Sequence, residues 1–182
     1  MIFMLKNWYG VYTKPKLEMV VSKLLNKKKV INYCPLNTLM AKNKSGFIEY
    51  QIPLFPNFVF VNIDDQQIEA IKSIQGVINF LFWLGRPVQL RNNEIEQLMI
   101  FVKKFKNIRV EKVPVELKSL MLIDKSSLQK SSDFELNSEG IATYALPSLG
   151  FCLKAYADDK KNFTQISDEK IQSEWDIYYS KY

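Results

Sequence analysis

Apolar residues recur with two different periods along the first hundred residues of the chain. Where they alternate with their neighbours, as in Trp8–Thr13, the pattern predicts β-strands. The predicted strands cover residues 8–13, 30–36, 57–63 and 77–83. Where they recur every three to four residues, the pattern predicts helices. One begins near Pro15, and a second covers roughly 65–74 and ends at Gly76.

The resulting order is strand, helix, strand, strand, helix, strand. That order is typical of the split β-α-β arrangement of a ferredoxin-like α+β domain, in which the helices cover one face of an antiparallel sheet. The first helix would bury an apolar stripe made of Leu17, Val20, Val21, Leu24 and Leu25.

Two less regular segments accompany this pattern. The polar segment 37–50, with Gly46 at its tip, is typical of a long exposed hairpin or loop. An amphipathic helix is predicted over 93–105, after a turn at 85–87. Its buried stripe would be Ile95, Leu98, Met99 and Val102.

The remaining third of the chain predicts a smaller, separate structure. Strands are indicated at 113–117, 140–146 and 150–156, with a polar loop at 125–138, and Ser167 could cap a last helix. We therefore expect four parts. They are a first domain at 1–105, a mixed-charge linker at 106–112, a small β domain at 113–157 and a tail with a helix at 158–182.

Composition excludes several function classes. The chain of 182 residues contains no histidine, which removes the usual general base and the common zinc ligand sets. Cys34 and Cys152 lie far apart without neighbouring ligand residues, so we expect two reduced thiols, as is usual in the cytoplasm. No apolar run is long enough for a membrane span, and residues 1–6 lack the features of a secretion signal. We expect neither an enzyme, nor a metal or cofactor site, nor a membrane protein.

The positive charge of the chain is concentrated at its beginning. Residues 1–50 carry nine lysines against Glu18 and Glu49, a net charge of +7, whereas the other 132 residues carry sixteen basic and seventeen acidic side chains. A lysine-rich solvated face would explain part of this excess. A surface that faces a polyanion would explain the rest, because phosphate contacts release counterions.

Aromatic residues gather in two segments, at Trp8–Tyr12 and at Leu54–Val61. Alternation along the second segment places Phe58 and Phe60 on one face of a strand and the two valines on the other. Ordinary core is one interpretation of these rings, and a partner-binding surface is the other.

Several motifs in these segments resemble the amino-terminal domain of NusG-like transcription elongation factors. They occur in the family's order over about 80 residues: Trp8-Tyr9-x-Val11-Tyr12-Thr13-Lys14-Pro15-x-x-Glu18, Tyr33-x-Pro35-Leu36, Pro53-Leu54-Phe55-Pro56-Asn57-Phe58-Val59-Phe60-Val61, Gly76-Val77 and Gly85-Arg86-Pro87. The Leu-Phe-Pro-Asn-aromatic form is similar to the specialised RfaH- and UpxY-type antiterminators.

The resemblance implies a factor without enzymatic activity that binds the clamp helices of the bacterial RNA polymerase β′ subunit, bridges the cleft and suppresses pausing or termination. The family uses an apolar pocket built on its first and third strands. Carried over by position, the polymerase-binding residues would be Trp8, Tyr9, Phe55, Pro56, Phe58 and Phe60, with Phe80 and Phe82 as additions from the fourth strand.

The family also contacts upstream or non-template DNA. Lys14 and Lys16 match the positions where its basic residues do so. Charge alone extends the set to Lys23, Lys27, Lys42 and Lys44. Contacts of this kind would be made to phosphate and would be sensitive to salt.

The carboxy-terminal part departs from the family pattern. The family's second domain is a small KOW barrel with a Gly-rich turn, and Lys125–Lys130 stands at that place here. Ala145–Phe151 retains a likeness to the last part of the barrel in UpxY-type proteins. The resemblance therefore implies a degenerate KOW-like β domain, and it leaves open whether this domain contacts the ribosome or a termination factor.

Two other functions fit parts of the pattern. An RNA-binding module with a ferredoxin-like sheet would stack bases on Phe58 and Phe60, and would require these rings to face solvent among lysines. A small hydrolase of the same fold would need an anion cradle, and no Gly-rich loop supplies one.

Overall fold

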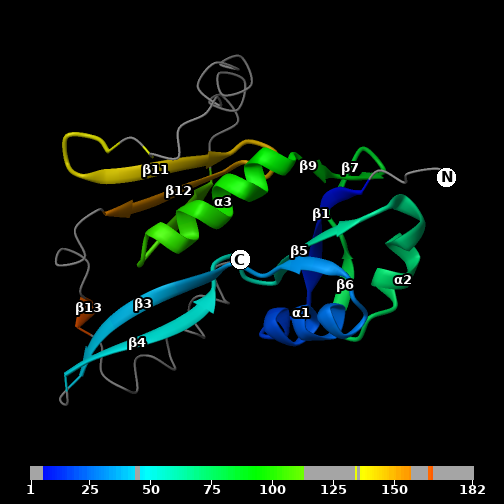
Figure 1. Cartoon of the computed structure of the whole chain (residues 1–182), viewed down its shortest axis with the longest axis horizontal. Coiled ribbons are helices and arrows are strands. Elements are labelled where there is room, and N and C mark those ends of the chain that lie inside the picture. The colour runs from blue at the N-terminus through cyan, green and yellow to red at the C-terminus, as the bar shows by residue number, and fades with distance from the viewer. Residues whose placement is uncertain (1–5, 44–45, 113–133, 135, 157–163, 166–182) are drawn as a thin grey trace. The chain divides into compact units, whose positions relative to one another are not determined.

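The computed structural model describes residues 6–43, 46–112, 134, 136–156 and 164–165. The described residues fall into two compact units, which we treat separately (Figure 1). Unit 1 contains residues 6–35 and 53–95, and unit 2 contains residues 36–52 and the described residues from 96 onward. The predictions for Lys44, for 113–117, for Lys125–Lys130 and for a helix from Ser167 lie outside the described residues.

Unit 1 has the predicted α+β fold. Its antiparallel sheet has the strand order β2-β5-β1-β6, with β9 also paired to β1. When the strands of the hairpin at 36–53 are left out of the numbering, this is the order 2-3-1-4 that a split β-α-β chain produces. The elements are β1 (Asn7–Thr13), α1 (Glu18–Lys27), β2 (Ile31–Tyr33), β5 (Phe58–Ile63), η1 (Asp65–Gln67), α2 (Ile68–Lys72), β6 (Val77–Phe80) and β9 (Gln89–Leu90).

The main core of unit 1 lies on the side of the sheet that faces α1 and α2. Alternate residues of β1 and β5 point into it, and α1 and α2 cover them. The buried members are Tyr9, Val11, Val21, Leu25, Val59, Val61, Ile63, Ile71, Ile74 and Phe80. Val20 is 47% exposed, so its expected place in the buried stripe of α1 is wrong. The stripe follows Leu17, Val21 and Leu25 at a spacing of four residues, and Val20 lies to one side of that line.

The predicted strand at 77–83 is divided in the structure. β6 ends at Phe80, and Leu81 donates its backbone N–H to the carbonyl oxygen of Gly10 at 2.8 Å. The chain then forms a short hairpin from β7 (Phe82–Trp83) and β8 (Arg86–Pro87). Leu84 and Gly85 connect the two strands with φ angles of 49° and 77°, which suit a tight hairpin turn.

Unit 2 contains the predicted hairpin at 37–50, formed by β3 (Leu36–Asn43) and β4 (Gly46–Pro53). Asn37 is buried and fastens this hairpin to the chain that follows α3 (Asn92–Lys104). Its amide nitrogen donates to the carbonyl oxygen of Ile108 at 2.8 Å, and its amide oxygen accepts from the N–H of Ile108 at 2.9 Å. An ion pair between Lys106 and Glu49 at 2.6 Å joins the same segments.

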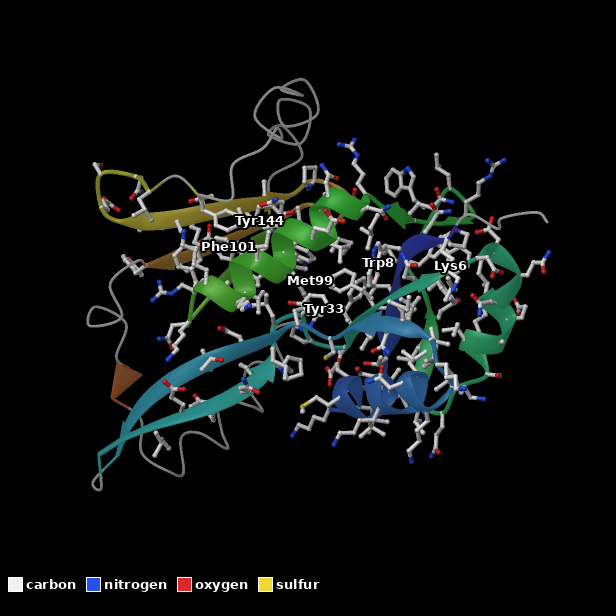
Figure 2. All side chains as sticks on the ribbon, in the orientation of Figure 1. Lys6, Trp8, Tyr33, Met99, Phe101 and Tyr144 are labelled. Carbon is white, nitrogen blue, oxygen red and sulfur yellow. The ribbon has the colours of Figure 1, made fainter. Side chains whose placement is uncertain are left out.

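The rest of unit 2 is a three-stranded antiparallel sheet of order β10-β12-β11 and a ring cluster on α3. Its strands are β10 (Arg109–Lys112), β11 (Ile141–Leu146) and β12 (Phe151–Tyr156); the short β13 (Thr164–Gln165) pairs with β3 instead. Residues 109–112, which we expected in a linker, are therefore a strand of this sheet. Phe101 contacts Phe105, Phe134 and Tyr144 at centroid distances of 4.8–5.9 Å (Figure 2). It takes the buried position on α3 that the sequence pattern assigned to Met99 and Val102, which are half-buried.

Candidate functional site

The face of the sheet opposite α1 and α2 carries most of the aromatic residues singled out in the sequence. β1 and β5 pair with Tyr12 opposite Phe58 and Gly10 opposite Phe60, and β2 places Tyr33 beside Phe60. Residues paired across strands share a face, so the register builds a grid of apolar positions there. We call this set the aromatic face: Trp8, Tyr12, Ile31, Tyr33, Phe58 and Phe60.

The rings of the aromatic face pack edge to face around Phe60. The centroid of Phe58 lies 5.2 Å from that of Phe60, and Phe55 lies 5.8 Å away, with interplanar angles of 76° and 87°. Tyr33 stacks on Phe60 at 6.4 Å, and Tyr12 meets Phe58 edge to face at 5.3 Å. Such arrangements are favourable beyond the area they bury, so each ring holds its neighbour in place.

Gly10 makes this packing possible. A Cβ added to it would lie 2.8 Å from Cε1 and 3.0 Å from Cε2 of Phe58, and closer still to Cζ. The ring of Phe58 therefore lies across the backbone of β1 at the one position of that strand without a side chain. The carbonyl of Gly10 also accepts the N–H of Leu81, so the same residue supports the β7–β8 hairpin.

Exposure divides the aromatic face into a buried centre and an accessible border. Phe60 is fully buried and Phe58 is 7% exposed, whereas Tyr12 is 41% and Ile31 is 56% exposed. Trp8 and Phe55 are also buried, and Pro56 is half-buried in the turn before β5. Tyr12 and Ile31 are therefore the most exposed members of the aromatic face, and the inner rings pack beneath them.

The other predicted polymerase-binding residues lie elsewhere. Tyr9 and Phe80 point to the helix side and contact each other edge to face at 6.0 Å within the core. Phe82 is exposed on the β7–β8 hairpin. The structure thus brings Trp8, Phe58 and Phe60 together on one face and separates them from Tyr9, Phe80 and Phe82.

The hydroxyl of Tyr9 joins three elements at the edge of the core. It donates a hydrogen bond to Asp65 at the start of η1 and accepts one from the side chain of Gln89 at 3.0 Å. Burial, and secondly the bond to Asp65, raise the pKa of this phenol above its ordinary value of 10.0. The contacts indicate a structural role for Tyr9.

Three connections meet at one end of the sheet, and they contain several of the motifs quoted above. The turn at Asn57, which has a φ of 60°, accepts the N–H of Thr13 at 2.8 Å. Its own N–H donates to the buried carboxylate of Glu18 at 2.5 Å. Lys14 donates its backbone N–H to Gly76 at 2.8 Å. Glu18 therefore fixes the turn that leads into the aromatic strand β5.

Four of the predicted nucleic-acid-binding lysines are exposed in unit 1. Lys14 and Lys16 lie in the connection between β1 and α1, and Lys23 and Lys27 lie on α1. Lys42 belongs to β3, where only its backbone is described, and Lys44 is outside the described residues. Lys14 and Lys16 therefore lie at the end of the sheet that carries Asn57 and Gly76, whereas Lys23 and Lys27 lie farther along α1.

Sequence reasoning missed three of the relevant residues. Tyr12 shares a face with Trp8 by simple alternation along β1, so the pattern contained the signal. Tyr33 enters the face only through the register of β2 on β5, which the sequence does not fix. Trp83 was expected in a strand and does lie in one, the short β7, but the pattern did not indicate that it is 72% exposed next to the tip of a hairpin.

Among the described residues, no group of three or more His, Cys, Asp or Glu side chains could hold a metal ion. Burial, and secondly the charge of Glu18, raise the pKa of the Cys34 thiol from 9.0 to about 12. Burial likewise raises the pKa of the Cys152 thiol.

In the described part of the chain, no helix combines the length and the hydropathy needed to cross a bilayer.

Comparisons with known proteins give two findings. Residues 6–99 match the family described as "Transcription termination factor nusG". Among solved structures, the chain is similar to that described as "Domain interaction in Thermotoga maritima NusG", with 15% sequence identity and a TM-score of 0.43. That likeness covers 84% of this chain and 94% of the other. No curated protein matches the sequence.

Proposed function

Because the chain belongs to the NusG family of transcription factors, we propose that it is a specialised elongation and antitermination factor of the RfaH or UpxY type. It binds the clamp helices of the bacterial RNA polymerase β′ subunit and bridges the active-site cleft. By holding the clamp closed it suppresses pausing or termination. This action needs no bond chemistry, in keeping with a chain that has no histidine.

The observation that carries this proposal is the aromatic face. Three adjacent strands place six apolar residues on the side of the sheet away from α1 and α2, and Tyr12 and Ile31 remain accessible at its border. Accessible aromatic and aliphatic side chains supported by a rigid apolar base are typical of the centre of a protein interface. We therefore assign first contact with the clamp helices to Tyr12 and Ile31, and a supporting role to Phe58 and Phe60.

The exposed lysines give the second contact. Lys14, Lys16, Lys23 and Lys27 would bind the phosphates of upstream or non-template DNA once the sheet is docked on polymerase. Such contacts orient a factor on nucleic acid without reading its sequence. The protein would act in the cytoplasm, and a ribosomal or termination-factor partner of the carboxy-terminal part stays a prediction.

The burial of the central rings argues against base stacking on this sheet. An RNA-binding sheet would present Phe58 and Phe60 to solvent, but they are 7% and 0% exposed. Their edges and faces are instead occupied by Phe55, Tyr12 and Tyr33.

Binding to core RNA polymerase tests the proposal. We would measure the affinity of the full chain for core enzyme by interferometry, comparing wild type with Tyr12→Ala and Ile31→Ser. Loss of a contact residue at an interface centre weakens binding by at least about fivefold. Val20→Ser is the matched control, since the exposure of Val20, 47%, lies between those of Tyr12 and Ile31, but Val20 lies on α1. The proposal fails if wild type does not bind, or if the control weakens binding as much as Tyr12→Ala does.

The lysine contact has a separate readout. In a transcription complex with an open upstream fork, Lys14→Glu combined with Lys16→Glu should weaken binding and reduce its dependence on salt, since fewer counterions are released. Binding to core enzyme without nucleic acid should not change. If both assays lose affinity equally, the lysines contact protein and the DNA part of the proposal is wrong.

A further inference from the structure

The β7–β8 hairpin presents a second apolar surface, separate from the aromatic face. Trp83 is 72% exposed and Leu84, at its tip, is 88% exposed. Tryptophan is seldom so accessible in a folded protein, because burying its large ring is favourable. The hairpin therefore displays an indole ring that folding alone does not require there.

The hairpin is a defined support and not a loose loop. Val88 donates its N–H to the carbonyl oxygen of Leu81 at 2.8 Å, and Leu81 donates its own to Gly10 of β1 at the same distance. Phe82 pairs with Pro87, and Trp83 pairs with Arg86. The backbone that carries the indole is thus held in place, which reduces the conformational entropy lost on binding.

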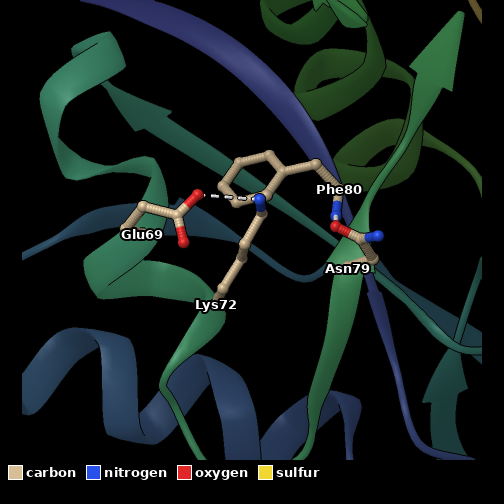
Figure 3. Close-up of polar contacts among 4 residues, drawn as sticks. All are labelled: Glu69, Lys72, Asn79 and Phe80. Carbon is tan, nitrogen blue, oxygen red and sulfur yellow. Dashed lines mark hydrogen bonds and ion pairs between the residues drawn. The ribbon is translucent and has the colours of Figure 1, made fainter. Parts of the chain in front are cut away.

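The β7–β8 hairpin carries one cation, Arg86, and no carboxylate of its own. Residues 70–93 contain Lys72, Arg86 and Arg91 and no Asp or Glu. Arg86 is exposed and, as the register partner of Trp83, lies on the same face of the hairpin. The ammonium group of Lys72 lies 5.6 Å from the ring centroid of Phe82. Figure 3 shows the pair that the same ammonium group forms with Glu69, at 2.8 Å. The hairpin thus carries two aromatic rings, those of Phe82 and Trp83. Trp83 is the more exposed of the two, and Arg86 lies on the same face of the hairpin.

We propose that the hairpin binds single-stranded nucleic acid, with a base stacked on the indole of Trp83 and the adjacent phosphate paired with the guanidinium of Arg86. An exposed aromatic ring beside a cation is a combination that unpaired strands bind. A duplex offers no free base face to Trp83. The contact lies outside the lysine set and the aromatic face, and it can be tested without polymerase.

The test uses the full chain and short labelled oligonucleotides in fluorescence anisotropy at low salt. Single-stranded DNA and single-stranded RNA of one pyrimidine sequence form two arms, and the DNA duplex forms a third. Trp83→Ala should weaken single-strand binding by about 5- to 150-fold. Trp83→Phe, which keeps a ring, should restore most of the affinity. Arg86→Gln should reduce the slope of log affinity against log salt by about 0.7, as expected for one phosphate contact to a single strand.

Leu84→Ser is the matched control, because it removes apolar surface from the same tip without removing a ring. It should leave oligonucleotide binding within twofold of wild type. The proposal is wrong if Leu84→Ser or Trp83→Phe weakens binding as much as Trp83→Ala, or if the duplex binds as tightly as the single strands. It is also wrong if Trp83→Ala changes affinity for core polymerase and leaves oligonucleotide binding intact, since the tip would then contact protein. The last result would leave the proposed docking through Tyr12 standing.

Discussion

Substitution of Gly10 by alanine tests whether the ring of Phe58 is locked onto β1. Gly10 is not among the residues with a positive φ, so the backbone itself accepts alanine. In the absence of a clash, Gly→Ala stabilises a protein by about 0.4–1 kcal/mol, because it restricts the unfolded chain. Here the new Cβ would lie 2.8–3.0 Å from two carbons of Phe58 and closer to a third.

The clash should outweigh the gain in the unfolded chain. The Phe58 ring cannot move freely, because Tyr12 and Phe60 contact it at centroid distances of 5.3 and 5.2 Å. Overpacking of a filled site costs about 1–3 kcal/mol. We therefore expect Gly10→Ala to lower the free energy of unfolding by about 1–2 kcal/mol.

A double-mutant cycle with Phe58→Leu isolates the contact. Leucine lacks the ring carbons that meet the Cβ, so Gly10→Ala should be neutral or stabilising in that background. Urea unfolding followed by tryptophan fluorescence gives the four free energies, and hydrogen exchange of the β1 peptide shows that the loss lies in unit 1. The reasoning is refuted if Gly10→Ala stabilises the wild type, or if its effect is the same in both backgrounds.

Three further predictions concern the supports of the two units. Glu18→Ala should destabilise unit 1 by about 1–3 kcal/mol in urea unfolding, because it leaves the Asn57 N–H without its carboxylate acceptor. Glu18→Gln should destabilise it less, because the amide keeps an acceptor oxygen. Asn37→Ala should destabilise unit 2 by about 2 kcal/mol or more, because the backbone N–H and carbonyl of Ile108 both lose their partner. An unchanged hydrogen-exchange rate of the Ile108 amide would contradict this prediction. Cys34 keeps its proton in the folded state to about pH 12 but loses it near pH 9 when unfolded, so its contribution should make stability fall as pH rises between these values. Cys34→Ala should flatten that decline, and an identical pH profile for both proteins would count against the raised pKa.

The periodic part of the sequence determined much of the fold. Alternation in Trp8–Thr13 and in 57–63 predicted β1 and β5 closely, because each strand is buried on both sides and its register is strongly constrained. The order of elements then implied the sheet. The division at Leu81 was missed, since it depends on a hydrogen bond to Gly10 that no local pattern encodes. Strand β10 was also missed, because its mixed-charge residues have little apolar periodicity and pair with β12, about forty residues later.

The candidate site was predictable in its residues but not in their accessibility. The aromatic segments at Trp8 and Phe58 do pair on one face. Which rings are exposed follows from three-dimensional packing: Phe58 fills the space above Gly10, and Tyr12 remains at the border. Tyr9 and Phe80 point to the opposite side by the alternation of their own strands.

Photocrosslinking from position 12 tests the central proposal most directly. A chain with Tyr12→p-benzoylphenylalanine would be irradiated with core RNA polymerase, and the crosslinked peptides identified by mass spectrometry. The same substitution at Val20, on α1, is the control. We predict crosslinks from position 12 to the clamp helices of β′ and none from position 20. Crosslinks from position 12 to other polymerase surfaces, or equal crosslinking from both positions, would contradict docking through the aromatic face.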